Sequence, residues 1–410
     1  MLATRHDSAP IDPNLVRGRF VAGLALAVLA CTALAYHRAL GSGFVSDDYH
    51  IIESVVRRGP FGIWSSHQSN FFRPVFSLSL YLDHALWGLD PRGYHLVNLL
   101  LHVWNACLVG ILSFVTAGAA GIGRDRSETA GLAAGLLFAV LPSHAEPVYW
   151  ISCRGDLLAC SFSLSSILSI VLYLRGGGSR WLAVSLAAAA LAMSTKEAAI
   201  TLPLLAVALA LSRSRLLSGQ GATARRVRAV AANAALLVLY LAVRWWVLGH
   251  LVGGYGKAVH GRLGLEEIGK IFLYFPSRML APSLGVVEIG GVIVPYTLFV
   301  YAGAVLLALI LLARRSRLFL EMLFMAVGMM FILLLPVMNL SVRAVSSEGE
   351  RFLYLPSTAL VLAVATVLAA ALSRRAILVA TLLLTVPGLL FLHTAGDRWT
   401  KAGAHARRTV

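Results

Sequence analysis

Charged residues are scarce in this sequence. Asp, Glu, Lys and Arg make up 13% of the 410 residues, whereas 58% of the residues are hydrophobic and the mean hydropathy is +0.78. A soluble globular domain carries about 25% charged residues, so the composition excludes an ordinary soluble protein. Repeated apolar runs approaching the roughly 20 residues that cross a bilayer indicate an all-α polytopic membrane protein.

Cysteine and acidic residues are also few. The four cysteines show no Cys-x-x-Cys spacing and lie mostly in apolar runs, so they predict neither a disulfide framework nor a metal centre. The 19 acids face 35 Lys and Arg. In a membrane protein such an excess marks the cytoplasmic loops, so we expect no nucleic-acid partner. The first apolar run lacks a small-x-small cleavage site and predicts a span, with no cleaved leader.

Hydropathy predicts about 11 transmembrane helices, of which the fifth and sixth are short for a bilayer core of about 30 Å. The predicted spans are 21–40, 95–117, 130–147, 156–174, 181–194, 198–212, 229–249, 291–313, 318–337, 354–373 and 376–394.

Loop charges orient these spans. With the N-terminus inside, the cytoplasmic segments hold 17 of the 35 bases but only five of the 19 acids. Short, arginine-rich loops that contain few acids are typical of the cytoplasmic side. We therefore predict a cytoplasmic tail at 1–20, a transmembrane domain at 21–394 and an extracytoplasmic tail at 395–410.

The long first extracytoplasmic loop, 41–94, opens with "GFVSDDYH", which places Asp47 and Asp48 beside the first span. Ionisable groups near membrane depth are functional candidates, although a solvated helix end is the simpler alternative. Amphipathic helices along the membrane surface are expected in the extracytoplasmic loops at 75–89 and 266–285.

A second outer motif, "LPSHAEPVYWISCRGD", combines His144, Glu146, Arg154 and Asp156. A histidine and a carboxylate two residues apart are a weak signal for a metal. A structural salt bridge from Arg154 to Asp156 or Glu146 is the alternative.

Further outer motifs are "FFRPVF", "STKEAAITLP" and "EGERFLYLPS". Lysine held beside a carboxylate at a membrane surface suits anion binding, although snorkelling is common. Guanidinium groups bind phosphate bidentately. These motifs contribute Arg73, Lys196, Glu197, Glu350, Arg351 and Tyr354.

The second span carries a polar stripe of His95, Asn98, His102 and Asn105. The spacing i, i+3, i+7, i+10 puts these side chains on one face of a helix. For Asn98, His102 and Asn105 the favoured interpretation is a hydrogen-bonded seam between helices. For His95, at the outer end of the span, a functional site and a seam are equally good interpretations.

Five motifs in order, "FVSDDYH", "FFRPVFSLSLYLDHALWGLDPRGYHLVNLLLH", "LPSHAEPVYWISCRGDLLA", "STKEAAITLP" and "ERFLYLPS", resemble the transmembrane part of the TMTC-type O-mannosyltransferases and their bacterial relatives. The resemblance covers about 41–358 and implies the GT-C glycosyltransferase fold. It further implies a polyprenyl-phosphate sugar donor, an extracytoplasmic active site and, for a bacterial relative, the inner (cell) membrane. The tetratricopeptide repeats of eukaryotic members are not matched here. The resemblance therefore does not decide whether the sugar is mannose, or whether the acceptor is a protein or a glycan.

In this resemblance the acidic motif of the first outer loop is catalytic, with Asp47 preferred as the base and Asp48 as its neighbour. Arg73, Lys196 and Arg351 are expected to bind the donor phosphate. No metal is required, although Asp48 leaves a divalent ion open. The remaining residues expected to line the substrate cavity are His95, His144, Glu146, Arg154, Glu197, Glu350 and Tyr354.

Two other functions fit a polytopic protein with polar groups. A transporter or flippase of lipid-linked sugars would show broken helices or repeated halves, and the sequence predicts neither. A non-catalytic membrane scaffold would not require the outer motifs to converge in space.

Overall fold

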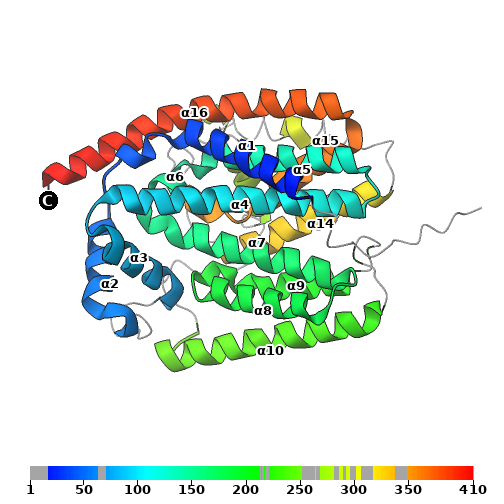
Figure 1. Ribbon diagram of the computed structural model, residues 1–410, viewed down its shortest axis with the longest axis horizontal. Helices are drawn as coiled ribbons and strands as arrows, with labels where there is room; N and C mark the ends of the chain where they lie inside the picture. The colour runs from blue at the N-terminus through cyan, green and yellow to red at the C-terminus, as the bar shows by residue number, and fades with distance from the viewer. Residues whose placement is uncertain are drawn as a thin grey trace, which may run out of the picture.

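The computed structural model describes residues 17–62, 71–212, 214, 217, 221–251, 264, 268–280, 286–289, 292–295, 302–305, 317–337 and 349–409. Its long helices lie side by side across Figure 1. They are α1 (Gly18–Tyr36), α4 (Pro91–Ala119), α7 (Arg154–Leu174), α10 (Ala222–Leu248), α14 (Arg317–Leu334) and α16 (Arg374–Thr409).

Shorter elements fill the spaces between these helices. The short α-helices are α2 (Asp48–Gly62), α3 (Pro74–Trp87), α5 (Arg124–Ala139), α6 (Ala145–Tyr149), α8 (Ser179–Met193), α9 (Leu202–Leu211), α12 (Phe275–Leu280) and α15 (Ser357–Ala371). The 3-10 turns are η2 (Ala39–Gly41), η3 (Pro142–His144), η4 (Ile151–Cys153), η5 (Glu197–Thr201), η9 (Leu335–Val337) and η10 (Glu350–Leu353), and a π-helical turn, η8, covers Lys270–Tyr274.

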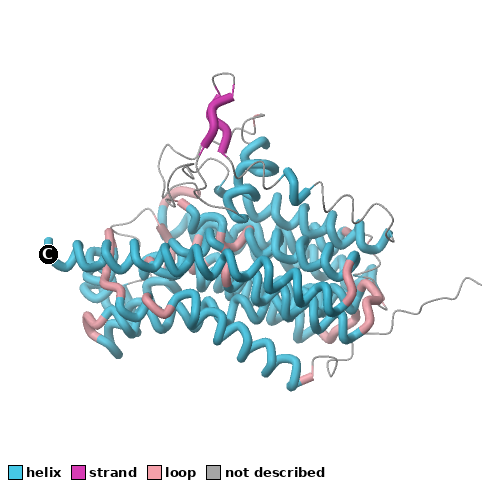
Figure 2. The backbone as a smooth tube through the Cα atoms, turned by 90° about the horizontal axis from the view of Figure 1, so that it is seen from above, coloured by secondary structure: helices cyan, strands magenta, loops and turns pink. Residues whose placement is uncertain are grey.

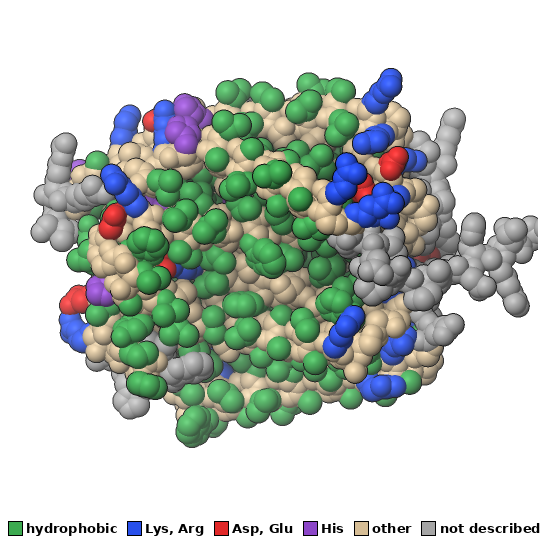
Figure 3. All heavy atoms as spheres, in the orientation of Figure 1, with side chains coloured by type: hydrophobic (Ala, Val, Ile, Leu, Met, Phe, Trp, Pro, Cys, Tyr) green, Lys and Arg blue, Asp and Glu red, His purple; other side chains and the backbone are tan. Residues whose placement is uncertain are grey.

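The prediction of a multi-pass helical membrane protein is confirmed. Among the described residues six helices are long and apolar enough to cross a bilayer, or seven if one bent pair forms a single span. Figure 3 shows apolar side chains over the middle of the bundle and charged side chains toward its two ends. The predicted number of about 11 spans stays a prediction, because part of it rests on residues outside the described ranges.

Two predicted spans differ from the structure. The segment 130–147 is broken, since α5 ends at Ala139 and the next helical segment, Pro142–Tyr149, is bent from it by 53°. Pro142 lacks a backbone N–H and disfavours helix in the residue before it. The sequence did not predict this bend.

The second difference lies at the start of 291–313. Residues 292–295 form strand β2 (Val292–Pro295), which pairs antiparallel with β1 (Val286–Ile289). Figure 2 shows this hairpin projecting from the helices. Valine and isoleucine favour strands as well as spans, so hydropathy could not separate the two.

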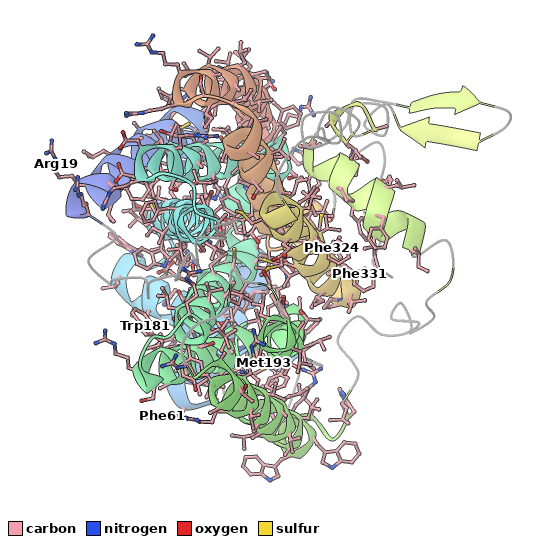
Figure 4. All side chains as sticks on the ribbon, turned by 90° about the vertical axis from the view of Figure 1, so that its right-hand side faces the viewer. Arg19, Phe61, Trp181, Met193, Phe324 and Phe331 are labelled. Atoms are coloured by element: carbon pink, nitrogen blue, oxygen red, sulfur yellow. The ribbon has the colours of Figure 1, made fainter. Side chains whose placement is uncertain are left out.

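Close packing joins α4 and α5. A Cβ atom built on Gly110 would lie 2.8 Å from the carbonyl oxygen of Gly131, and one on Gly131 would lie 2.8 Å from that of Gly110. Small residues allow two helix backbones to approach in this way. End-on in Figure 4, α8 and α10 lie together in the lower part of the bundle, and α14, with Phe324 and Phe331, lies on the side nearer the hairpin.

The end of the bundle that carries α2 and α3, at the left of Figure 1, is called the acidic-loop end below. The prediction of a helix at 75–89 is confirmed by α3, whose Leu82 and Leu86 are exposed and whose Asp83 is buried. At 266–285 the described residues form a π turn followed by α12. Residues 395–409, predicted as a tail, continue α16 past the rest of the bundle (Figure 1).

Candidate functional site

Two buried or half-buried ion pairs meet beside one aromatic ring at the acidic-loop end. Arg351 donates from its side chain to Glu146 at 2.5 Å and from its backbone nitrogen at 2.7 Å. Lys196 donates to both carboxylate oxygens of Asp156 at 2.5 Å. The ring of Phe352 lies 4.7 Å from the Arg351 guanidinium and 5.4 Å from the Lys196 ammonium. Three segments far apart in the sequence thus bring two cations together.

Arg73 joins this cluster through Glu197, the residue after Lys196. Its guanidinium donates to Glu197 at 2.8 Å and packs 4.0 Å from the Phe71 ring. Arg244 of α10, which the sequence analysis did not select, lies 3.8 Å from the other oxygen of Glu197. The three cations expected to bind phosphate therefore lie at one end of the molecule.

The two adjacent aspartates have different surroundings. Asp48 is fully buried and accepts hydrogen bonds from the backbone nitrogens of Val45 and Ser152, both at 2.8 Å, and from the Ser152 hydroxyl. Asp47 is exposed, directly precedes α2, and its carboxylate has no hydrogen bond or ion pair among the described residues. Asp48 joins the acidic loop to η4, and the carboxylate of Asp47 is accessible.

Burial dominates the ionisation of Asp48. It raises the pKa of this carboxyl from 3.8 to about 6, against the opposing hydrogen bonds from Ser152 and Val45, and the neighbouring charge of Asp47 adds to the rise.

Arg154 has a structural role. Its guanidinium is fully buried and donates to Asn98 at 2.8 Å, to the carbonyl of Tyr94 at 2.6 Å and to Asp83. A structural salt bridge was the alternative interpretation for Arg154, and one is present, with Asp83 of α3 as the partner in place of Asp156 or Glu146. All three nitrogens of the guanidinium are used, so Arg154 holds α3, α4 and α7 together.

The polar stripe of α4 is largely a seam between helices. His102 is 2.7 Å from the Tyr354 hydroxyl and 3.0 Å from the Ala139 carbonyl, and Asn105 donates to the Leu157 carbonyl at 2.9 Å. Asn98 accepts from Arg154 in the same way. These contacts agree with the seam favoured for these three residues, and they place Tyr354 in it.

Two histidines expected at the substrate cavity lie inside the bundle. His144 is fully buried, lies 2.9 Å from the Ser357 hydroxyl and packs 4.5 Å from the ring of Tyr354. His95 is also fully buried, and neither of its ring nitrogens has a hydrogen-bond partner among the described residues. Neither ring is exposed at the surface of the bundle.

Glu350 forms a second buried pair, with Arg278 of α12, at 2.6 Å. Both side chains are fully buried, and burial raises the pKa of Glu350 to about 8 while Arg278 opposes the rise. Of the two adjacent residues in η10, Glu350 therefore pairs with Arg278, and Arg351 pairs with Glu146. Arg278 was not among the residues predicted from the sequence, although a charge in an apolar segment was a usable signal.

No protein-family model matches the chain. Fruit-fly protein O-mannosyl-transferase Tmtc1 is 36% identical over 200 residues, which cover 44% of this chain and 22% of that protein. Human TMTC4 is 30% identical over 221 residues, 47% of this chain and 29% of that protein. A crystal structure of ArnT from Cupriavidus metallidurans bound to undecaprenyl phosphate superposes with a TM-score of 0.50 at 14% identity, over 93% of this chain and 76% of ArnT. The fold is the GT-C glycosyltransferase fold.

Within the GT-C fold, the chain resembles the TMTC-type O-mannosyltransferases, as the five sequence motifs indicated. The matched segments span 20% to 29% of the lengths of the fly and human proteins Tmtc1, Tmtc2 and TMTC4. The likeness to ArnT, at 14% identity, concerns the fold alone.

No metal cluster is part of this GT-C bundle as far as its described residues go. They hold no group of three His, Cys, Asp or Glu side chains that could bind a metal ion. Both oxygens of Asp48 already accept from N–H or O–H donors. One cavity of about 70 Å³ lies toward the opposite end, between α4, α7, α9, α14 and α15, and its lining, which includes Leu112, Met322 and Met329, has no titratable side chain.

Proposed function

We propose that the protein is a membrane glycosyltransferase that moves a sugar, mannose among the candidates, from a polyprenyl-phosphate donor to an acceptor hydroxyl on the extracytoplasmic face. The observation that carries the proposal is the convergence of Arg73, Lys196 and Arg351 at the end of the bundle that also exposes Asp47. The GT-C fold and the resemblance to TMTC-type transferases support it.

Asp47 is the proposed general base. An acceptor hydroxyl is a poor nucleophile, and a carboxylate within hydrogen-bond reach takes its proton as the oxygen attacks the anomeric carbon. The new glycosidic C–O bond forms while the anomeric C–O bond to phosphate breaks, and the polyprenyl phosphate leaves with the bonding electron pair. Asp47 suits this role because it is accessible, whereas Asp48 is enclosed by its three donors.

Arg351 and Arg73 are the proposed phosphate ligands closest to solvent. Their side chains are 22% and 19% exposed, whereas that of Lys196 is 8% exposed. Each is held by a carboxylate, so a phosphate would compete with Glu146 or Glu197 for the guanidinium. Positive groups that meet a departing phosphate stabilise the transition state, often as the largest single term. The prenyl tail stays in the bilayer, with its phosphate at the interface.

No metal is required in this proposal, because lysine and arginine can neutralise a monophosphate leaving group. We place the protein in a bacterial cell membrane with the acidic-loop end outside, since the arginine-rich loops are typical of the cytoplasmic side. The acceptor is a protein or a glycan.

The two alternatives make different predictions. A scaffold does not require five outer motifs to converge, and the ion pairs among them argue against it. A flippase of lipid-linked sugars gains one supporting observation, the 53° break between α5 and the segment Pro142–Tyr149. A flippase would leave the sugar on its lipid, so release of the sugar from the lipid distinguishes a transferase from a flippase.

The test uses purified protein in detergent with undecaprenyl phosphate mannose labelled in the sugar, and membranes from the source cell as acceptor. We expect label to leave the lipid fraction and free undecaprenyl phosphate to accumulate. In Arg351→Gln the KM for the donor should rise at least tenfold. Arg57→Gln is the matched control, because Arg57 is an exposed arginine of the same end paired only with Glu53 on its own helix. Donor that stays intact with wild-type protein, or equal KM values in the two variants, would refute the proposal.

A further inference from the structure

The last helix reaches the acidic loop from the other end of the sequence. We define the C-terminal arm as residues 393–406 of α16 and the acidic loop as residues 38–48. Figure 1 shows α16 passing over the bundle to the end where α1 gives way to α2. With 36 residues, α16 is about 54 Å long, well beyond the roughly 30 Å of a bilayer core. The arm is therefore the part of α16 at the acidic-loop end.

Polar contacts tie the arm to the start of the acidic loop. Arg38 donates to the carbonyl of His393 at 3.0 Å and forms an ion pair with Asp397. One turn further on, the hydroxyls of Ser42 and Thr400 lie 3.2 Å apart, and Ser42 is buried. The loop is thus held along two turns of one helix face.

Glycine brings the two backbones into contact nearest the aspartates. A Cβ atom on Gly403 would lie 2.6 Å from the Gly43 nitrogen and 2.9 Å from its Cα atom. These distances are shorter than real Cβ contacts, and the opposing atoms are backbone, so any larger residue at 403 must displace the loop. Gly396, on the same helix, faces a side chain of α6, since a Cβ atom there would lie 2.4 Å from the Tyr149 hydroxyl. Gly396, Thr400 and Gly403 share one helix face by their spacing.

The three residues between Gly43 and Asp47 transmit this contact. Phe44 is buried against the ring of Tyr94, and Val45 donates to Asp48. Ser46 has a φ of +53°, in the left-handed region, which costs a residue other than glycine about 1–2 kcal/mol. Such a conformation persists only where both sides of it are fixed. The arm fixes one side, and the bonds from Asp48 to Ser152 fix the other.

We propose that the C-terminal arm is a positioning element for Asp47, and that Gly403 is its positioning residue. The proposal rests on the proposed transferase activity. The arm sets the position of the loop backbone, and that backbone sets where the Asp47 carboxylate meets the acceptor hydroxyl. A displacement of about 1 Å at a reacting group can lower a rate by roughly 100-fold.

The test compares Gly403→Ala with Gly23→Ala. A Cβ on Gly23, which lies in α1, meets nothing within 4 Å, so the control adds the same methyl group to a helix without a contact. In both variants alanine favours the helix by about 1 kcal/mol over glycine. We expect kcat to fall at least tenfold in Gly403→Ala, with the donor KM within twofold of wild type, because the proposed phosphate ligands lie on other segments. Gly23→Ala should keep both constants.

A second readout does not depend on activity. Hydrogen exchange of the peptide covering residues 41–49 should become at least tenfold faster in Gly403→Ala and stay unchanged in Gly23→Ala. Faster exchange together with an inactive wild type would refute the transferase proposal and leave the arm contact standing. The positioning role would be overturned if Gly403→Ala kept both the kcat and the exchange rate of the wild type. It would also be overturned if kcat fell in this variant and the donor KM rose by the same factor.

Discussion

Replacing Asp48 by asparagine separates the roles of the two adjacent carboxylates. Asp48 accepts from the Val45 nitrogen on one oxygen and from Ser152 on the other. An asparagine side chain offers only one oxygen, so its NH₂ group must face one of these N–H donors. A buried donor left without an acceptor costs about 1–3 kcal/mol. We expect Asp48→Asn to destabilise the protein by this amount at pH 7, where the carboxylate is ionised, and Asp47→Asn, at an exposed position, to leave stability unchanged.

The pH dependence of this difference has a definite sign. The folded pKa of Asp48, about 6, lies above its ordinary 3.8, so the protonated form is preferred in the folded state. This stabilisation is complete below pH 3.8 and is lost as the pH rises through 6. Between pH 5 and pH 7 the wild type should lose about 1.4 kcal/mol through this group. Asparagine does not titrate, so the cost of Asp48→Asn should fall by the same amount.

Unfolding titrations in mixed detergent micelles at pH 5 and pH 7 measure both quantities. Asp47→Asn serves as the control for a change of charge in the same loop. A cost of Asp48→Asn that grows with pH, or an equal cost in the two variants, would show that Asp48 is not the buried, hydrogen-bonded member of the pair.

Two further predictions concern the buried polar groups. Arg154→Ala leaves Asp83 buried without its partner and should lower the free energy of unfolding by about 3–5 kcal/mol in the same titration. Combining Arg154→Met with Asp83→Leu should restore most of this lost stability, and a double variant as unstable as Arg154→Ala would contradict the prediction. Tyr354→Phe removes the hydroxyl that His102 and Asn105 share and should lower the free energy of unfolding by about 1–3 kcal/mol. The control is Tyr81→Phe on α3, because the Tyr81 hydroxyl has no hydrogen bond among the described residues. Equal stability of the two variants would argue against the seam.

The sequence predicted the class of the protein because hydropathy is a local property. Apolar runs and arginine-rich loops marked most of the helices, and the five ordered motifs indicated the GT-C fold. Local properties could not find the break before Pro142 or the strand at 292–295. In both segments apolar composition continues, while backbone geometry decides the structure.

Pairing of charges was the least predictable feature of the site. Asp156 and Glu146 were the alternative salt-bridge partners considered for Arg154, but a residue two positions along a helix points to a different face. The observed partner, Asp83, comes from α3, and only the packing of α3 on α7 brings the two together. The motifs identified residues that cluster at one end, and the structure showed which acid holds each base.

The central claim is that Asp47 activates an acceptor hydroxyl at the acidic-loop end. The most direct measurement is transfer of labelled mannose from undecaprenyl phosphate mannose by purified wild type, Asp47→Asn and Asp48→Asn at pH 7. We predict that Asp47→Asn lowers kcat by about 10²–10⁴-fold with normal stability, since this is the usual contribution of a general base. Turnover by Asp47→Asn at the wild-type rate would contradict the account.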